Sequence, residues 1–122
     1  MKKVLTVLIA GPYRSGTNDD PQLMAQNLQR MEEVALPVFR AGHIPVIGEW
    51  FALPLLKQAG SKQPGDEVYQ EISYPIARRM LLKCNAVLRI KGESKGADGD
   101  VAVAKAAGLR IYYSLDELLA DN

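Results

Sequence analysis

Side chains that could do chemistry gather in the stretch Ser94 to Asp100, near the C-terminal end of the chain. Its seven residues include a serine, a lysine, two glycines and two carboxylates. The stretch lies between the apolar run 86–90, which is typical of a strand, and the Ala- and Val-rich run 101–107, which is typical of a helix. In a parallel sheet this junction lies at the carboxyl end of the strand, where open α/β folds bind ligands. The N–H groups that begin the helix add a partial positive charge there.

Two further loops are expected at the same edge of the sheet. Residues 11–17 follow the apolar run 4–10, and residues 48–51 follow the short β-branched run 44–47. These loops should bring a phenol, a guanidinium, a carboxylate and an indole toward the first stretch: Tyr13, Arg14, Glu49 and Trp50. Such a set suits a small polar ligand that has a ring and an anionic group.

The elements that must position these loops alternate between strand and helix. Near-continuous apolar runs predict strands, and these runs occupy 4–10, 44–47, 86–90 and 109–113. Apolar stripes at helical spacing and capping residues predict helices, at 21–41, 68–81, 101–107 and from 114 onward. The order predicts one α/β domain over residues 1–122, with a three-layer, flavodoxin-like parallel sheet of four to five strands and helices on both faces.

Prolines and a polar segment refine this prediction. Pro45 comes early in the second strand, which favours an edge position in the sheet. Pro37 and Pro75 fall inside predicted helices, where proline removes a hydrogen bond and favours a kink. Residues 59–66 are rich in Gly, Ser, Lys, Gln and Pro, so they are expected to form a loop before the helix at 68–81.

Composition excludes several function classes. The chain of 122 residues is 48% hydrophobic and 24% charged, which is typical of a globular protein. A net charge of +1 gives no global attraction to nucleic acid or to an anionic membrane. The single cysteine, Cys84, excludes an internal disulfide and favours the cytoplasm. The apolar run 4–10 lacks a cleavage site and reads as a strand, not a signal peptide. His43 has no ligand partner at metal spacing, so neither a metal nor a cofactor is expected.

Three short motifs occur at the ends of the predicted strands, in the order Gly11-Pro12-Tyr13, Gly42-His43-x-Pro45 and Ser94-x-Gly96-x-x-x-Asp100. This ordered set resembles the nucleoside 2-deoxyribosyltransferase superfamily. That group includes nucleotide N-hydrolases and a set of uncharacterised small bacterial proteins, to which this sequence is most similar. The resemblance runs from about Val4 to Tyr113.

The resemblance implies a nucleoside or nucleotide substrate and cleavage or transfer at the N-glycosidic bond, through a covalent glycosyl–carboxylate intermediate. Asp100 matches the family's nucleophile, which is a Glu, and Tyr13 matches its helper phenol. A carboxylate in the first turn of a helix would be kept ionised by the helix dipole. The family's acidic residue on the helix before the third strand has no counterpart in 74–79. The resemblance also implies a homodimer or higher homo-oligomer.

The remaining residues of the predicted site hold the substrate. Ser94, Gly96 and Arg14 are expected to contact a phosphate or the sugar, and Trp50 is expected to flank the base. Gly11, Glu49 and Asp98 complete the set of predicted substrate-binding residues.

Alternatives remain at this point for both function and residues. The missing helix acid and the Asp in place of Glu favour a non-catalytic nucleotide-sensing module, and a dimerisation domain without a ligand is the third hypothesis. Asp98 and Asp100 have a structural alternative as helix caps. Tyr13 and Trp50 have one as packing residues, and Arg14 has one as a solvated side chain.

Overall fold

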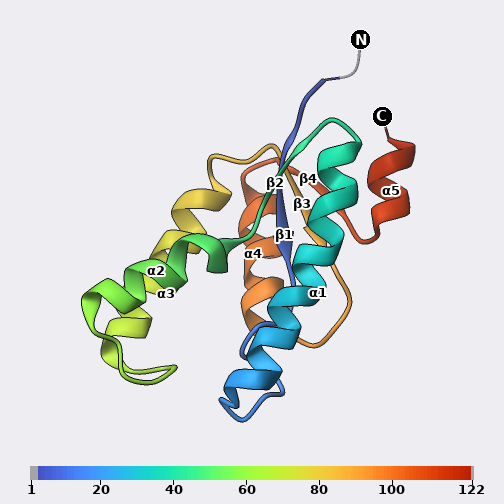
Figure 1. Ribbon diagram of the computed structural model, residues 1–122. Helices are drawn as coiled ribbons and strands as arrows, with labels where there is room; N and C mark the ends of the chain where they lie inside the picture. The colour runs from blue at the N-terminus through green and yellow to red at the C-terminus, as the bar shows by residue number, and fades with distance from the viewer. Residues whose placement is uncertain (1–2, 122) are drawn as a thin grey trace.

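A four-stranded, all-parallel sheet forms the centre of the structure, a computed structural model that describes residues 3–121 (Figure 1). Its strands are β1 (Thr6–Ala10), β2 (Ile44–Val46), β3 (Ala86–Arg89) and β4 (Arg110–Tyr112). They lie in the order β2-β1-β3-β4, and Leu8 of β1 is in register with Val46 on one side and Val87 on the other. The predicted α/β class and parallel sheet are confirmed, and Pro45 lies in an edge strand as predicted.

Helices cover both faces of this sheet. α1 (Pro21–Arg40) and α5 (Leu115–Ala120) pack on one face, and α4 (Lys95–Ala106) packs on the other (Figure 1). Successive side chains of β1 point to opposite faces and so supply two cores. The first core includes Leu5, Val7, Val38, Leu88 and Leu118, and the second includes Leu8, Ala10, Leu81, Val87 and Ala104. The predicted three-layer, flavodoxin-like arrangement is confirmed.

Between β2 and β3 the chain forms two helices where the sequence predicted one. α2 (Gly48–Ala59) and α3 (Glu67–Leu81) pack against each other and extend beyond the sheet (Figure 1). α2 has an internal proline, Pro54, and a narrow polar face, which hid its helical period in the sequence. It ends where Gly60 takes a left-handed conformation at φ +78°. α1 and α3 each remain one helix through Pro37 and Pro75.

The turn between α2 and α3 is organised by Asp66. Its Oδ1 accepts from the backbone N–H of Tyr69 at 2.8 Å and from the Ser61 hydroxyl at 2.9 Å, and its Oδ2 accepts from the N–H of Lys62 at 2.9 Å. These bonds lower the pKa of Asp66 to about 2. The cap therefore fixes the N-terminus of α3, which carries Tyr69 toward the site described below.

The third junction also differs from its prediction. The glycine-rich stretch after β3 is not a loop, because α4 begins at Lys95, six residues before the predicted helix. The cap is Ser94, whose Oγ accepts from the N–H of Ala97 at 3.1 Å. The alternative of Asp98 and Asp100 as the helix cap is therefore wrong. Asp100 lies in the second turn of α4, beyond the orphan N–H groups of the first turn.

Candidate functional site

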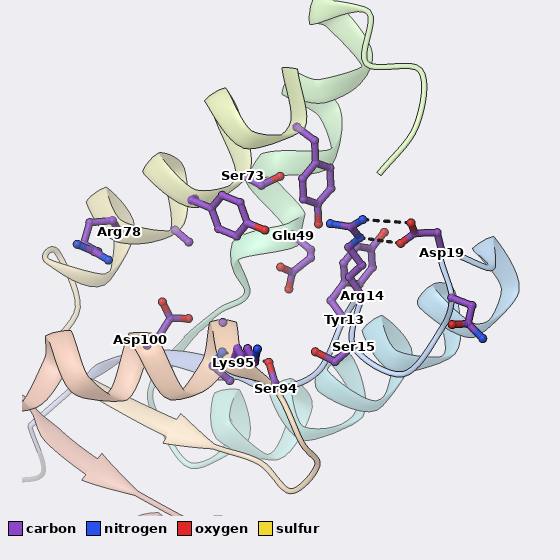
Figure 2. Close-up of a pocket in the computed structure, with 18 residues that line it drawn as sticks. Tyr13, Arg14, Ser15, Asp19, Glu49, Ser73, Arg78, Ser94, Lys95 and Asp100 are labelled. Atoms are coloured by element: carbon purple, nitrogen blue, oxygen red, sulfur yellow. Dashed lines mark hydrogen bonds and ion pairs between the residues drawn. The ribbon is translucent and has the colours of Figure 1, made fainter. Parts of the chain in front are cut away.

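A cavity of about 710 Å³ opens between the carboxyl edge of the sheet and the α2–α3 pair (Figure 2). Its walls come from the loop after β1, the start of α2, one face of α3 and the start of α4. This is where the strand order reverses between β1 and β3, the usual ligand position in such sheets. The three junctions that the sequence singled out therefore do meet at one hollow.

Seven of the nine residues named from the sequence line this cavity. They are Gly11, Tyr13, Arg14, Glu49, Ser94, Gly96 and Asp100. Gly11 is required for close packing, because a Cβ there would lie 2.5 Å from Cγ1 of Ile90. The structure places these residues together, and their roles toward a ligand stay predictions.

Trp50 does not line the cavity, so the expectation that it flanks a base is not supported by its position. Its indole Nε1 donates to Oε2 of Glu32 on α1 at 2.8 Å. Trp50 follows Glu49 directly on α2, and adjacent residues of a helix point about 100° apart. Because Glu49 faces the cavity, Trp50 is turned toward α1 instead.

Asp98 is likewise absent from the cavity wall. Its Oδ1 accepts from the Arg89 guanidinium at 3.0 Å, beside a second hollow on the far side of α4. Two positions along a helix correspond to a turn of about 200°, so Asp98 and Asp100 point in nearly opposite directions. The position of Asp98 therefore does not support the expected contact with substrate in this cavity, and its partner is Arg89.

Glu49 and Asp100 bring two carboxylates into the same cavity from different helices (Figure 2). Burial raises the pKa of Glu49 to about 7, and the negative charge of Asp100 adds to this increase. Burial also raises the pKa of Asp100 to about 6, although the cations Arg78 and Arg89 oppose the increase. Burial thus determines the direction of the pKa shift of Asp100, not the helix dipole that the sequence analysis invoked, although the side chain is still mostly ionised at pH 7.

This difference in pKa separates the two groups near neutral pH. At pH 7 a carboxyl of pKa about 6 is mostly ionised, and one of pKa about 7 is about half protonated. One cavity therefore holds two carboxyl groups whose pKa values burial raises toward neutrality, and Asp100, beside the cations, is the more ionised of the two. Paired carboxyl groups with different environments are the usual arrangement for acid and nucleophile roles.

The phenol of Tyr13 is coupled to Glu49. Burial raises the pKa of Tyr13, and the charge of Glu49 raises it further. The backbone carbonyl of Tyr13 accepts from Nδ2 of Asn27 at 2.8 Å, which fixes the loop to α1. The phenol was expected to orient Asp100, but the carboxylate whose charge acts on it is Glu49.

Arg14 lines the cavity with its guanidinium already engaged. Nε donates to Oδ1 of Asp19 at 2.6 Å and Nη2 donates to Oδ2 at 3.1 Å, and the group lies 5.6 Å from the centre of the Tyr69 ring (Figure 2). Asp19 can turn back to Arg14 because Asn18 and Asp19 take left-handed φ values of +50° and +59°. Nε and Nη2 are thus engaged within the protein, so a contact of Arg14 with a phosphate or ribose, which stays a prediction, would fall to Nη1.

The same guanidinium ties the loop after β1 to the turn before α3. Nη2 of Arg14 donates to the Pro64 carbonyl at 3.4 Å. The next residue, Gly65, has a left-handed φ of +83° and lies against the guanidinium, since a Cβ there would come within 2.4 Å of Nη2. Arg14 therefore links the loop after β1 to the turn before α3 at one end of the cavity.

One face of α3 contributes site residues that the sequence analysis missed. Tyr69, Ser73 and Ala77 recur every four residues and line the cavity, together with Tyr74 and Arg78 in the adjacent row. Tyr69 and Tyr74 form an edge-to-face pair with ring centres 6.2 Å apart. Ser73 and Ala77 were the signal in the sequence. They are small residues on a helix stripe that would carry bulky apolar side chains if it packed in the core.

Two cations of the wall, Arg78 and Lys95, have no ion pair within residues 3–121. Lys95 is the first residue of α4, directly after the cap at Ser94. Arg78 projects from α3 on the side of Asp100 (Figure 2). An anionic group of a ligand could pair with these two cations.

Among the described residues no cluster of three or more His, Cys, Asp or Glu side chains could hold a metal ion. His43 is buried and its Nδ1 accepts from the N–H of Leu5 at 3.0 Å, a structural role. None of the described helices is both long enough and apolar enough to cross a bilayer.

The geometry thus supports binding of a small polar ligand beside two carboxyl groups, an aromatic pair and two cations. These groups come from the three helices α2, α3 and α4 and line the same cavity. Comparison of the chain with protein-family models, with curated proteins and with solved structures finds no match.

Proposed function

We propose that the protein binds a nucleoside or nucleotide in this cavity and cleaves or transfers its glycosyl group at the N-glycosidic bond. The observation that carries the proposal is the pair of largely buried carboxyl groups, Glu49 and Asp100, with raised and unequal pKa values. Glycosyl transfer needs two such groups, one on each side of the reacting bond. The motifs shared with the nucleoside 2-deoxyribosyltransferase superfamily support the same reaction.

Asp100 is the nucleophile of this proposal. It is the more acidic of the pair, and Arg78 and Arg89 favour its ionised form. A carboxylate at this place stabilises positive charge on the sugar carbon and can bond to that carbon, as in retaining glycosidases. Its position on α4, a capped helix of twelve residues, holds it rigidly.

The start of α4 supplies the anion-binding groups. The N–H groups of the first turn, at Lys95 and Gly96, have no carbonyl partner in a preceding turn. Gly96 lines the cavity without a side chain, so a phosphate or a sugar hydroxyl can approach the backbone closely. The Lys95 ammonium adds a full positive charge beside them.

The aromatic face of α3 takes the role that the sequence gave to Trp50. Tyr74 lines the cavity with 57% of its surface exposed, and it is braced from one side by Tyr69. An exposed ring held in this way offers a stacking surface to a planar base. The ring of the ligand would then lie toward α3 and its anionic group toward α4.

The homodimer implied by the resemblance is a further part of the proposal. α2 carries exposed apolar side chains at Phe51 and Leu55, outside the cavity wall. Exposed apolar groups on one helix are a common feature of self-association surfaces.

Product analysis tests the proposed reaction. We expect wild-type protein, incubated with a panel of ribo- and deoxyribonucleosides and their 5′-monophosphates, to release free base that chromatography detects. The Asp100→Ala variant should release none while its melting temperature still rises with the same ligand. If wild-type protein binds a nucleotide and releases no base, the protein is a sensing module. If no ligand raises the melting temperature, the binding proposal fails as well.

A further inference from the structure

We infer that Glu49 is the general acid that protonates the departing base. This inference rests on the proposed function and adds a catalytic residue to it. The resemblance implies an acidic residue on the helix before the third strand, and residues 74–79 contain no carboxylate that could take this role. The cavity receives the missing carboxyl group from another element, the first turn of α2.

Elimination leaves Glu49 alone among the described carboxyl groups. Three acidic side chains line the cavity: Asp19, Glu49 and Asp100. Asp19 is held by both Nε and Nη2 of Arg14, which lowers its pKa and removes it as a proton donor. The positive charges of Arg78 and Arg89 favour the ionised form of Asp100. Of the three carboxyl groups, Glu49 is the one placed to carry a proton into the reaction.

The surroundings of Glu49 favour its protonated form. The titratable groups that face it are Asp100 from α4, Tyr13 from the loop after β1 and Tyr69 from α3. Asp100 is negative when ionised. The two phenols are neutral at pH 7, because the ordinary pKa of a phenol is about 10 and burial and the charge of Glu49 raise it further. Within residues 3–121 no cation contributes to the pKa of Glu49, and the hydrogen bond from its own backbone opposes the effect of burial only in part. Figure 2 shows its carboxyl group directed into the space between Asp100 and the Tyr13 loop.

The two carboxyl groups then divide the reaction between them. A carboxylate oxygen of Asp100 bonds to the anomeric carbon as the bond from that carbon to the base nitrogen breaks, and the electron pair of the broken bond stays with the base. The Glu49 proton moves to the base, which leaves as a neutral molecule. Glu49, now ionised, takes a proton from the water that attacks the glycosyl ester. This second step releases the sugar and restores both carboxyl groups to their starting forms.

The test compares two leaving groups in the Glu49→Gln variant. One substrate is a purine nucleotide, whose base needs a proton to leave. The other is its N7-methylated form, whose base is already cationic and leaves without one. The rate compared is that of base release in the first turnover, which precedes hydrolysis of the glycosyl ester and so excludes the later role of Glu49 as a base. We expect Glu49→Gln to lower this rate with the first substrate by about 100- to 10,000-fold and with the second by less than about 10-fold. Glu33→Gln, on the exposed surface of α1, serves as the matched control and should change neither rate.

The pH profile gives a second readout. With the unmodified substrate the wild-type rate should fall as pH rises through about 7, because Glu49 loses its proton there, and this fall should be absent in Glu49→Gln. An equal loss of rate with both substrates, or an unchanged rate with the first, would refute the role of Glu49 as general acid and leave the proposed function standing. A wild-type protein that cleaves no nucleoside or nucleotide refutes the proposed function instead, so the two failures are distinguishable.

Discussion

Replacing Asp100 by asparagine is expected to lower the rate of base release by at least about 1000-fold, because the variant keeps the shape of the side chain and loses the nucleophile. Binding should change little, since the contacts from α3 and from the first turn of α4 remain. Initial rates and calorimetric dissociation constants for the same nucleotide measure the two effects separately.

Asp98→Asn is the matched control for this prediction. Asp98 is on the same helix, but it pairs with Arg89 outside the cavity. Its substitution should leave the rate within several-fold of the wild-type rate. A similar loss in both variants would indicate that the effect comes from destabilising α4, and an active Asp100→Asn protein would contradict the assignment of the nucleophile.

Substituting Glu49 by glutamine is expected to stabilise the protein at alkaline pH relative to acidic pH. Burial raises the pKa of Glu49 from 4.5 to about 7. A group whose pKa is raised on folding contributes stability below its unfolded pKa and loses that contribution as pH rises through its folded pKa. The wild-type unfolding free energy should therefore fall between about pH 4.5 and pH 7 because of this residue, by up to roughly 3 kcal/mol.

Glutamine does not titrate, so this part of the pH dependence should disappear in the variant. The test is to measure the melting temperatures of the wild-type protein and of Glu49→Gln from pH 4 to pH 8. The difference between the two proteins should change across this range by an amount on the order of 10 °C. An effect of the amide that does not depend on pH is the same at both ends of the range and therefore cancels. Glu33→Gln should give a difference that hardly changes with pH. A flat difference for Glu49→Gln would show that its carboxyl is not held protonated by burial.

The fold could be derived from the sequence because its rules are strong and local. Apolar runs separated by helical stripes allow little except a parallel sheet, and Pro45 places its strand at an edge. Parallel strands share a carboxyl edge, so the meeting of the loops at Tyr13, Glu49 and Ser94 follows from the topology alone. The helix α2 was missed, because Pro54 and its mostly apolar composition concealed the period.

The details of the site depended on rotation about helix axes, which the sequence did not determine. Starting α4 at Lys95 turned Asp100 into the cavity and Asp98 out of it. One step along α2 separates Glu49 in the cavity from Trp50 beside α1. The face of α3 with Tyr69 could not be assigned before the α2–α3 packing was known.

The partners of charged groups could not be derived from the sequence either. Asp19 pairs with Arg14 because two adjacent non-glycine residues take left-handed conformations, and composition does not indicate such an arrangement. Arg78 and Lys95, the two cations of the cavity wall without an ion pair within residues 3–121, lie 17 positions apart in the sequence, on different helices. Glu49, the carboxyl group that we propose as the general acid, was visible in the sequence, but its burial was not.

The central claim is that Asp100 bonds to the sugar, and the mass of the intact protein during turnover tests it most directly. A nucleoside analogue with fluorine at the 2-position of the sugar should slow breakdown of the glycosyl ester, because fluorine disfavours the positively charged transition state. We predict a mass increase equal to one fluorinated sugar, carried by the peptide that contains Asp100 and absent from Asp100→Asn. Release of base without any adduct, or an adduct on another residue, would contradict the account.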